Sequence, residues 1–193
     1  MFGQSTESAA AIASIFGWMN LFARGLGGVL SDSLNESYGM KGRLWAQVVM
    51  LLLEGVAVVA FAHTHSLAGS VVVLVFFSLC VQASEGCTFG LVPYVMPRYM
   101  GSVSGIVGAG GNAGAVGFGL CFKYMTYERA FIYMGTTIII SSTLTAFIRI
   151  KGHAGLFFGE DLAVDNETGE IVELAVDDSD HNLERRKVDD PLV

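Results

Sequence analysis

Residues 101–119 read GSVSGIVGAGGNAGAVGFG, a stretch that places eight glycines among nineteen residues. Glycine in the interior of a water-exposed helix costs about 1 kcal/mol relative to alanine, so this density needs a physical reason. Inside a membrane, small residues four positions apart let helix backbones touch, and such pairs begin at Gly101 and at Gly110. Asn112 lies among the glycines, where its amide needs a polar partner or a ligand. The stretch therefore predicts a closely packed membrane helix that lines a transport pathway.

The whole chain is too apolar for an ordinary soluble domain. Of its 193 residues, 52% are hydrophobic and 15% are charged, and the mean hydropathy is +0.55. Apolar runs long enough to cross a bilayer, which requires about 17–25 residues, lie at about 8–30, 44–62, 69–92, 102–122 and 130–148. We expect an all-α, polytopic membrane protein with five transmembrane helices in a helical region that covers residues 1–150.

Residues 151–193 form a polar, acidic tail. From Glu160 onward the chain carries 12 of its 18 acidic residues but 3 of its 11 lysines and arginines. A segment of this composition cannot bury enough apolar surface to fold alone, so we expect it to be disordered. The net charge of −7 belongs to this tail and gives no reason to expect a nucleic-acid partner.

The basic residues of the loops predict an orientation. With five spans, the loops near 31–43 and 93–101 and the segment after 148 share one side, where five basic residues lie close to the spans: Lys41, Arg43, Arg98, Arg149 and Lys151. The loops near 63–68 and 123–129 hold two. The positive-inside rule therefore places the first set and the C-terminus in the cytoplasm.

Arg24 is the most informative charged residue within a predicted span. A charge inside a bilayer costs about 2.5–3.5 kcal/mol on insertion scales, so such residues are candidates for function. The planar guanidinium can donate paired hydrogen bonds to an oxyanion. Asn20, one turn earlier, shares the same helix face. The alternative is that Arg24 reaches out to the lipid headgroups and has no ligand.

Two acidic residues also lie within predicted spans. Glu85 either carries a proton, pairs with a basic residue on a helix outside this chain, or makes a structural hydrogen bond. Glu54 is less informative, and we expect a structural role for it.

A short loop motif joins the first two predicted spans. Gly28 and Asp32 end the first span, and the basic residue Arg43 precedes the second. The carboxylate of Asp32 can lock a helix end through charge-assisted hydrogen bonds, or the motif is an ordinary solvated turn.

Nothing in the chain predicts a metal site, a cofactor or an enzyme. The three cysteines lie in predicted spans without metal-ligand spacing, and we expect them to be small core residues. Residues 108–113 match the glycine pattern of dinucleotide-binding proteins, but they lack the preceding strand that this fold requires.

Two motifs, in the same order and at similar spacing, resemble a known family. The first is FARGLGGVLSD at residues 22–32. The second is VQASEGCTFGLVPYV at residues 81–95, which continues through Arg98 and Gly105 into GAGGNAG at residues 108–114. They are similar to motifs of the high-affinity nitrate transporters in the nitrate/nitrite porter family, part of the major facilitator superfamily. The resemblance covers roughly residues 8–150.

The resemblance implies that the five spans correspond to helices 8–12 of a twelve-helix carrier in the plasma membrane. It implies proton-coupled symport of nitrate or nitrite by alternating access, with Arg24 as one of two anion-binding arginines. The other arginine would lie in N-terminal helices outside this chain, and some relatives need a single-span accessory protein. The glycine stretch would line the pathway with residues Gly108, Gly110, Gly111, Asn112 and Gly114. The alternatives are a facilitator for another solute and a truncated membrane subunit that does not transport.

Overall fold

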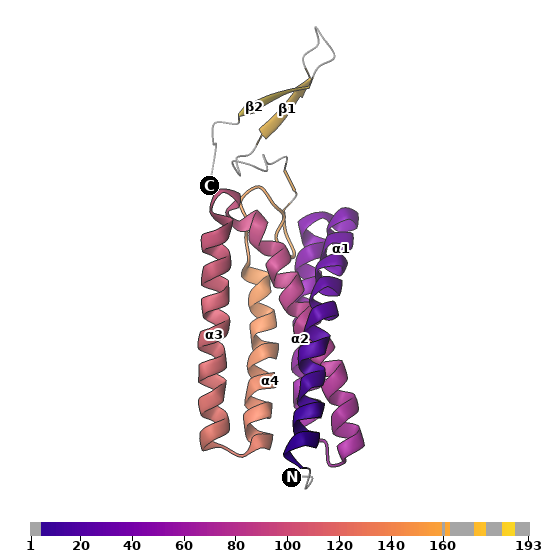
Figure 1. The fold of residues 1–193 in the computed structure, drawn as a ribbon. Coiled ribbons are helices and arrows are strands. Elements are labelled where there is room, and N and C mark those ends of the chain that lie inside the picture. The colour runs from indigo at the N-terminus through magenta and orange to yellow at the C-terminus, as the bar shows by residue number, and fades with distance from the viewer. Residues whose placement is uncertain (1–4, 160, 163–171, 177–182, 188–193) are drawn as a thin grey trace.

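The computed structural model describes residues 5–159, 161–162, 172–176 and 183–187. In this part of the chain, long helices stand side by side as a bundle, and two short strands pair near the C-terminus (Figure 1). The α-helices, the short 3-10 helices (η) and the strands are α1 (Thr6–Ala62), α2 (Leu67–Val95), η1 (Pro97–Tyr99), α3 (Met100–Tyr124), α4 (Tyr127–Leu144), η2 (Thr145–Phe147), β1 (Val172–Val176) and β2 (Leu183–Lys187).

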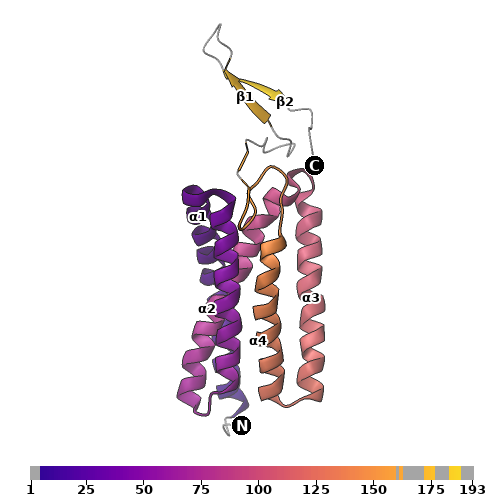
Figure 2. The ribbon, with the colours of Figure 1, turned by 180° about the vertical axis from the view of Figure 1, so that it is seen from behind.

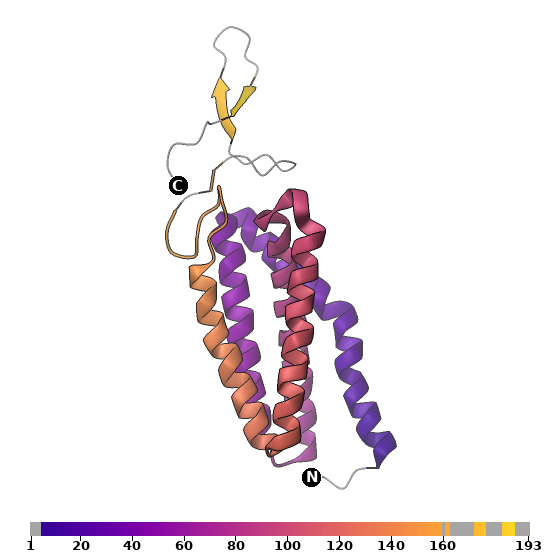
Figure 3. The same ribbon diagram turned by 90° about the vertical axis from the view of Figure 1, so that its left-hand side faces the viewer.

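The number of helices of spanning length differs from the expected five because of the first helix, α1. α1 has 57 residues, which would make a straight helix of about 86 Å against a hydrocarbon core of about 30 Å. At Gly39 the backbone leaves the helical conformation, with φ 63° and ψ −155°. Figures 1 and 3 show α1 doubling back on itself, so it has a first arm (residues 6–38) and a second arm (residues 40–62). Among the described residues, four helices rather than five are long and apolar enough to cross a membrane, because α1 contains two of the expected spans.

Gly39 is required at this turn for two reasons. Its positive φ favours glycine, and an added Cβ would lie 2.0 Å from Oδ2 of Asp161. That carboxylate accepts hydrogen bonds of 2.8 Å from the backbone N–H groups of Met40 and Ala154. We call residues 148–159 and 161–162 the C-terminal strap, and we call the end of the bundle that it covers the turn end. The strap adds two of the apolar side chains in a buried cluster made of Met40, Leu44, Leu91, Ile150 and Leu156.

Close glycine contacts lie between α1 and α2, not along α3 as expected. An added Cβ on Gly27 would lie 2.1 Å from the carbonyl oxygen of Ala83, and one on Gly86 would lie 2.1 Å from that of Arg24. By contrast, an added Cβ on any glycine of residues 101–119 would meet no atom within 4 Å. The backbone approach that small residues permit therefore joins the first arm of α1 to α2.

α3 stands at the edge of the bundle. Figures 1 and 2 show it beyond α4 from α1, and its contacts with other helices are to α2, η1 and α4. No residue of α3 is buried. α4 packs against the second arm of α1, where an added Cβ on Gly135 would lie 2.8 Å from the carbonyl oxygen of Gly55. One long face of the bundle is consequently left open within the described chain.

The two strands were not expected from the sequence. β1 and β2 pair antiparallel, from Val172 opposite Lys187 to Val176 opposite Leu183. β1 is an alternating segment of five residues, and β2 has one apolar residue followed by four charged ones, so together they give too short and too weak an alternation to reveal a strand pair. The predicted disorder of residues 163–171, 177–182 and 188–193 lies outside the described residues.

Candidate functional site

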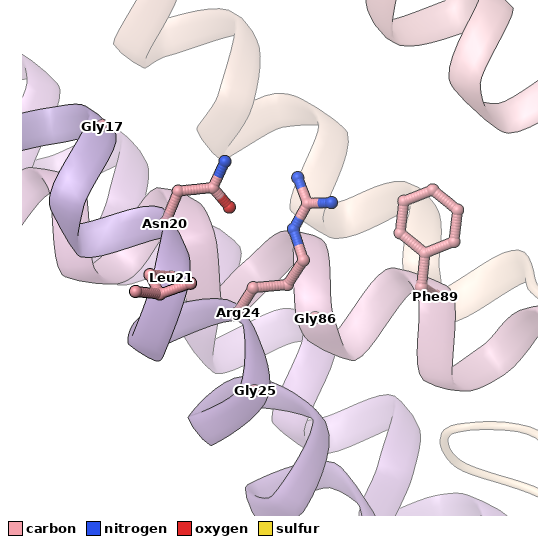
Figure 4. Close-up of a pocket in the computed structure, with 7 residues that line it drawn as sticks. All are labelled: Gly17, Asn20, Leu21, Arg24, Gly25, Gly86 and Phe89. Carbon is pink, nitrogen blue, oxygen red and sulfur yellow. The ribbon is translucent and has the colours of Figure 1, made fainter.

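A hollow lies between the first arm of α1 and α2 (Figure 4). Its volume is about 560 Å³, and it is open to the surroundings of the described chain. Glycines form much of its lining, which leaves space around one charged side chain. The lining residues are Gly17, Asn20, Leu21, Arg24, Gly25, Gly86 and Phe89.

Arg24 is the charged residue of this hollow. Figure 4 shows its guanidinium extending from the first arm between the amide of Asn20 and the ring of Phe89. The guanidinium carbon lies 6.0 Å from the centroid of that ring, within the range of a cation–π contact. The side chain is 43% exposed, so its donors are accessible to a ligand.

Glu85 has a basic partner within this chain rather than on a helix outside it. Its carboxylate forms an ion pair with Nη2 of Arg24. The side chain of Glu85 is 38% exposed. A carboxylate at this position occupies donors that an oxyanion would also use. Any oxyanion that bound at this guanidinium would therefore have to compete with Glu85 for its donors.

Gly86 determines how closely these groups approach one another. It follows Glu85 on α2, and its missing side chain lets the backbone of α2 touch the carbonyl of Arg24. A larger residue would separate the helices and move Glu85 away from its partner. Neither Gly86 nor Phe89 is among the residues predicted for a site. The available signal was for Phe89, which lies one turn after Glu85 on the same helix face, whereas Gly86 is adjacent to Glu85 and points away from that face.

The predicted site residues of the glycine helix are not part of this hollow. Their backbone and side chains lie on α3, which makes no contact with α1 in the described chain. The structure thus brings Asn20 and Arg24 together in the hollow. The other predicted site residues lie apart from it on α3: Gly108, Gly110, Gly111, Asn112 and Gly114.

Arg43 occupies a different environment at the turn end. Its side chain is 4% exposed, and Nη2 donates to Oδ1 of Asp32 at 2.6 Å. Nη1 donates to the hydroxyl of Ser31 at 3.2 Å and to the carbonyl of Gly90 at 3.1 Å. The ring centroid of Tyr94 lies 4.9 Å from the guanidinium carbon. Arg43 therefore ties the end of the first arm to α2 from a buried position, while its partner Asp32 is 64% exposed.

Gly28 has no contact with Arg43 and instead lies beside Gly86 of α2. An added Cβ on Gly86 would lie 2.9 Å from the backbone nitrogen of Gly28, so the two helices nearly touch here.

The described residues contain no group of three or more histidine, cysteine or acidic side chains that could hold a metal ion. Cys80, Cys87 and Cys121 are free thiols.

Comparison with curated proteins finds similar transporters. The chain is 41% identical over 156 residues to the high affinity nitrate transporter 2.5 of Arabidopsis thaliana, which covers 79% of this chain and 31% of the relative. It is 36% identical over 185 residues to the probable high-affinity nitrate transporter 2.4 of rice, covering 92% and 37%. It is 34% identical over 158 residues to the nitrate/nitrite transporter NrtP of a Picosynechococcus, covering 80% and 28%.

A relative with a different printed function also matches. The elsinochrome transporter 1 of Elsinoe fawcettii is 31% identical over 159 residues, which is 76% of this chain and 30% of the relative. No family model and no solved structure matches the chain. The chain spans about a third of the length of the curated nitrate transporters that it resembles.

Proposed function

Since this chain belongs to the nitrate/nitrite porter family, we propose that it forms part of a carrier that moves nitrate or nitrite across a membrane. The chain is a multi-pass integral membrane protein, with apolar helices of spanning length. The observation that carries the proposal is the accessible guanidinium of Arg24, paired with Glu85 at the edge of an open hollow.

The chemistry of Arg24 suits a small planar oxyanion. A guanidinium presents parallel N–H donors, and two oxygens of one anion can accept them together. The amide of Asn20 and the ring of Phe89 flank this group, so the anion meets a polar side and an aromatic side. In the empty site Glu85 compensates the charge of Arg24, and in the loaded site the anion does so.

The rest of the proposed site comes from helices outside this chain. Carriers with repeated halves bind substrate near the bilayer midplane between those halves and rock one half against the other. The open hollow and the unburied α3 supply one wall of such a site. The family resemblance adds a second arginine on the opposite wall, so that the anion bridges two positive charges. The glycines and Asn112 of α3 would line the pathway and let neighbouring helices slide past.

The proposal extends to coupling and orientation. A proton that enters with each anion keeps the carried charge at zero, which avoids moving net charge against a negative-inside potential. The turn end carries Lys41, Arg43, Arg98, Arg149 and Lys151, so it faces the cytoplasm of a plasma-membrane carrier. A single-span accessory protein remains a candidate partner from the resemblance.

The test is Arg24→Lys in the full carrier that contains this chain. Lysine keeps the positive charge but loses the paired N–H donors of the guanidinium. One hydrogen bond to a charged group is worth about 1.5–3 kcal/mol. We expect kcat/KM for nitrate uptake to fall about ten- to a hundredfold, the factor to which that energy corresponds. Arg129→Lys, at an exposed arginine in the first turn of α4, is the matched control. Uptake equal to that of the control would remove Arg24 from the binding site.

A second candidate function is transport of another solute. The similarity to the elsinochrome transporter favours it, because that relative matches over a comparable length. Competition separates the two functions. Nitrite should inhibit labelled-nitrate uptake by an anion carrier, whereas absence of nitrate uptake together with uptake of an unrelated solute would favour the second candidate.

A further inference from the structure

Glu54 is a buried acid that the proposed anion site does not use. It lies in the second arm of α1 and is 9% exposed, although the bilayer itself offers it no water. Its carboxylate oxygen Oε2 contacts the hydroxyl of Ser84 on α2. On its other side, the adjacent Gly55 packs against Gly135 of α4.

The hydrogen bonds of Ser84 indicate where a proton resides. Its hydroxyl oxygen contacts Glu54 and also lies 2.9 Å from the carbonyl oxygen of Val81. A hydroxyl has one hydrogen, and a carbonyl oxygen can only accept. If Glu54 were ionised, two acceptors would compete for that single hydrogen. A protonated Glu54 donates to Ser84, which then donates to Val81, and both contacts are satisfied.

The charges around Glu54 also favour the protonated form. On α2 the titratable groups that interact with Glu54 are Cys80, a thiol, and Glu85, a second acid. On α4 the charged residues are Glu128 and Arg129 in the first turn, seven and six residues before Gly135, or about 10 Å along the helix. The arginines of α1, Arg24 and Arg43, are paired with Glu85 and Asp32. An ionised Glu54 would be buried without a cation of its own, which is unfavourable.

Polar side chains continue from Glu54 toward the turn end. Thr88, one turn after Ser84, accepts a hydrogen bond of 2.8 Å from Nε2 of Gln47. Gln47 lies two turns before Glu54 and is 5% exposed, and its Oε1 has no hydrogen-bond partner within the described chain. In the other direction along α2, Ser78 and Gln82 also have buried side-chain oxygens without a hydrogen-bond partner in the described chain. Such atoms are usually satisfied by internal water, which can conduct a proton.

We propose that Glu54 is the proton-binding site of this carrier, separate from the anion hollow and reached along the interface of α1 and α2. The inference rests on the proposed function, and it names the group that carries the coupled proton. The proton adds to a carboxylate oxygen of Glu54 from water on one side of the membrane and leaves to water on the other. When an anion takes Arg24, Glu85 is released as a nearby negative charge, which holds the proton on Glu54 while the anion is bound.

The first experiment detects the proton directly in the purified full carrier. Infrared difference spectra of the wild type and Glu54→Gln should show loss of one carbonyl band of a protonated carboxylic acid. Glu128→Gln, at an exposed acid of α4, should keep that band. If Glu54→Gln does not fold, Ser84→Ala keeps the acid and should shift the band by removing its hydrogen-bond partner. A spectrum with no such band at Glu54 in the wild type overturns the proposal.

The second experiment measures coupling in vesicles that contain the full carrier. For one proton per anion, each pH unit supplies about 1.36 kcal/mol, which supports about tenfold accumulation of nitrate. Glu54→Gln should lose this accumulation but keep nitrate exchange without a pH gradient, whereas Glu128→Gln should keep both. Accumulation by Glu54→Gln that still follows the pH gradient overturns the proposal. The two failures can be told apart. If wild-type vesicles move no nitrate while the carrier still shows the Glu54 band, the proposed function is contradicted, but protonation of Glu54 is not.

Discussion

Two arginines of α1 show how surroundings determine the role of one residue type. Arg43 is buried, and its two terminal nitrogens donate to side-chain and backbone oxygens on α1 and α2, while its Nε has no partner within the described chain. Arg24 is 43% exposed and has one acidic partner, Glu85, at the edge of an open hollow. Exposed ion pairs contribute about 0.2–1 kcal/mol, so exchange of Glu85 for another anion costs little. Arg43 can therefore stabilise the helix pair, while Arg24 remains available to a ligand.

Replacement of Glu85 by glutamine tests this exchange. The Glu85→Gln variant no longer competes for the guanidinium, so we expect KM for nitrate uptake to fall by up to about fivefold, the factor that matches an exposed ion pair. Uptake should still respond to a pH gradient if Glu54 holds the proton. The measurement is nitrate uptake against concentration at two pH values, with Glu128→Gln as control. An unchanged KM would show that Glu85 does not restrict access to Arg24.

At the scale of elements, small residues set the distance between the first arm of α1 and α2. Gly27 meets the backbone of Ala83, and one turn away on α2 Gly86 meets the backbone of Arg24. Backbone atoms cannot rotate aside as a flexible side chain can, so these contacts tolerate no added atom. The same close approach positions Glu85 beside Arg24. The same glycine contacts therefore set both the packing of this helix pair and the geometry of the hollow.

Adjacent glycines of α1 offer a matched test of this packing. An added Cβ at Gly27 would lie 2.1 Å from the oxygen of Ala83, whereas one at Gly28 would meet nothing within 4 Å. We expect Gly27→Ala to lower the free energy of unfolding by about 1–3 kcal/mol, as overpacking does. Gly28→Ala should stay within about 0.5 kcal/mol of the wild type. Unfolding in mixed detergent micelles measures both, and equal effects would contradict the close approach.

At the scale of the whole molecule, the glycine helix α3 is the element whose packing is incomplete within the described chain. α3 has no buried residue and no close neighbour along its glycines, although this composition suits close packing. The chain spans about a third of the length of its nitrate-transporter relatives. In the proposed carrier, helices outside this chain would cover this face.

A leucine placed in the glycine face tests this inference. In the full carrier, Gly110→Leu should block the approach of a neighbouring helix and lower stability by about 1–3 kcal/mol, with loss of nitrate uptake. Val116→Leu, at a 67% exposed apolar position of the same helix, is the control. Thermal unfolding and uptake are measured on both variants. If the two behave alike, the glycine face has no close neighbour in the carrier.

Several features were predictable because they depend on local composition. The apolar runs predicted the membrane helices, and the isolated charge at Arg24 predicted a site with Asn20 on the same face. The sequence predicted a loop at residues 31–43 between spans 8–30 and 44–62, whereas the structure separates the two arms of α1 at the single non-helical residue Gly39, because one glycine with a positive φ is enough for the turn. The sequence did not pair Arg24 with Glu85, because 61 residues separate them in the chain.

The sequence by itself determined the environment of this protein, since hydropathy and span length are sums over neighbouring residues. It also determined which residues carry charge within the spans. Tertiary structure decided the partners of those charges. Arg24 with Glu85, Arg43 with Asp32 and Glu54 with Ser84 are brought together by helix packing. The physical reason is that a charge or a hydrogen bond acts over a few ångströms in space, and only the fold sets which distant residues come that close.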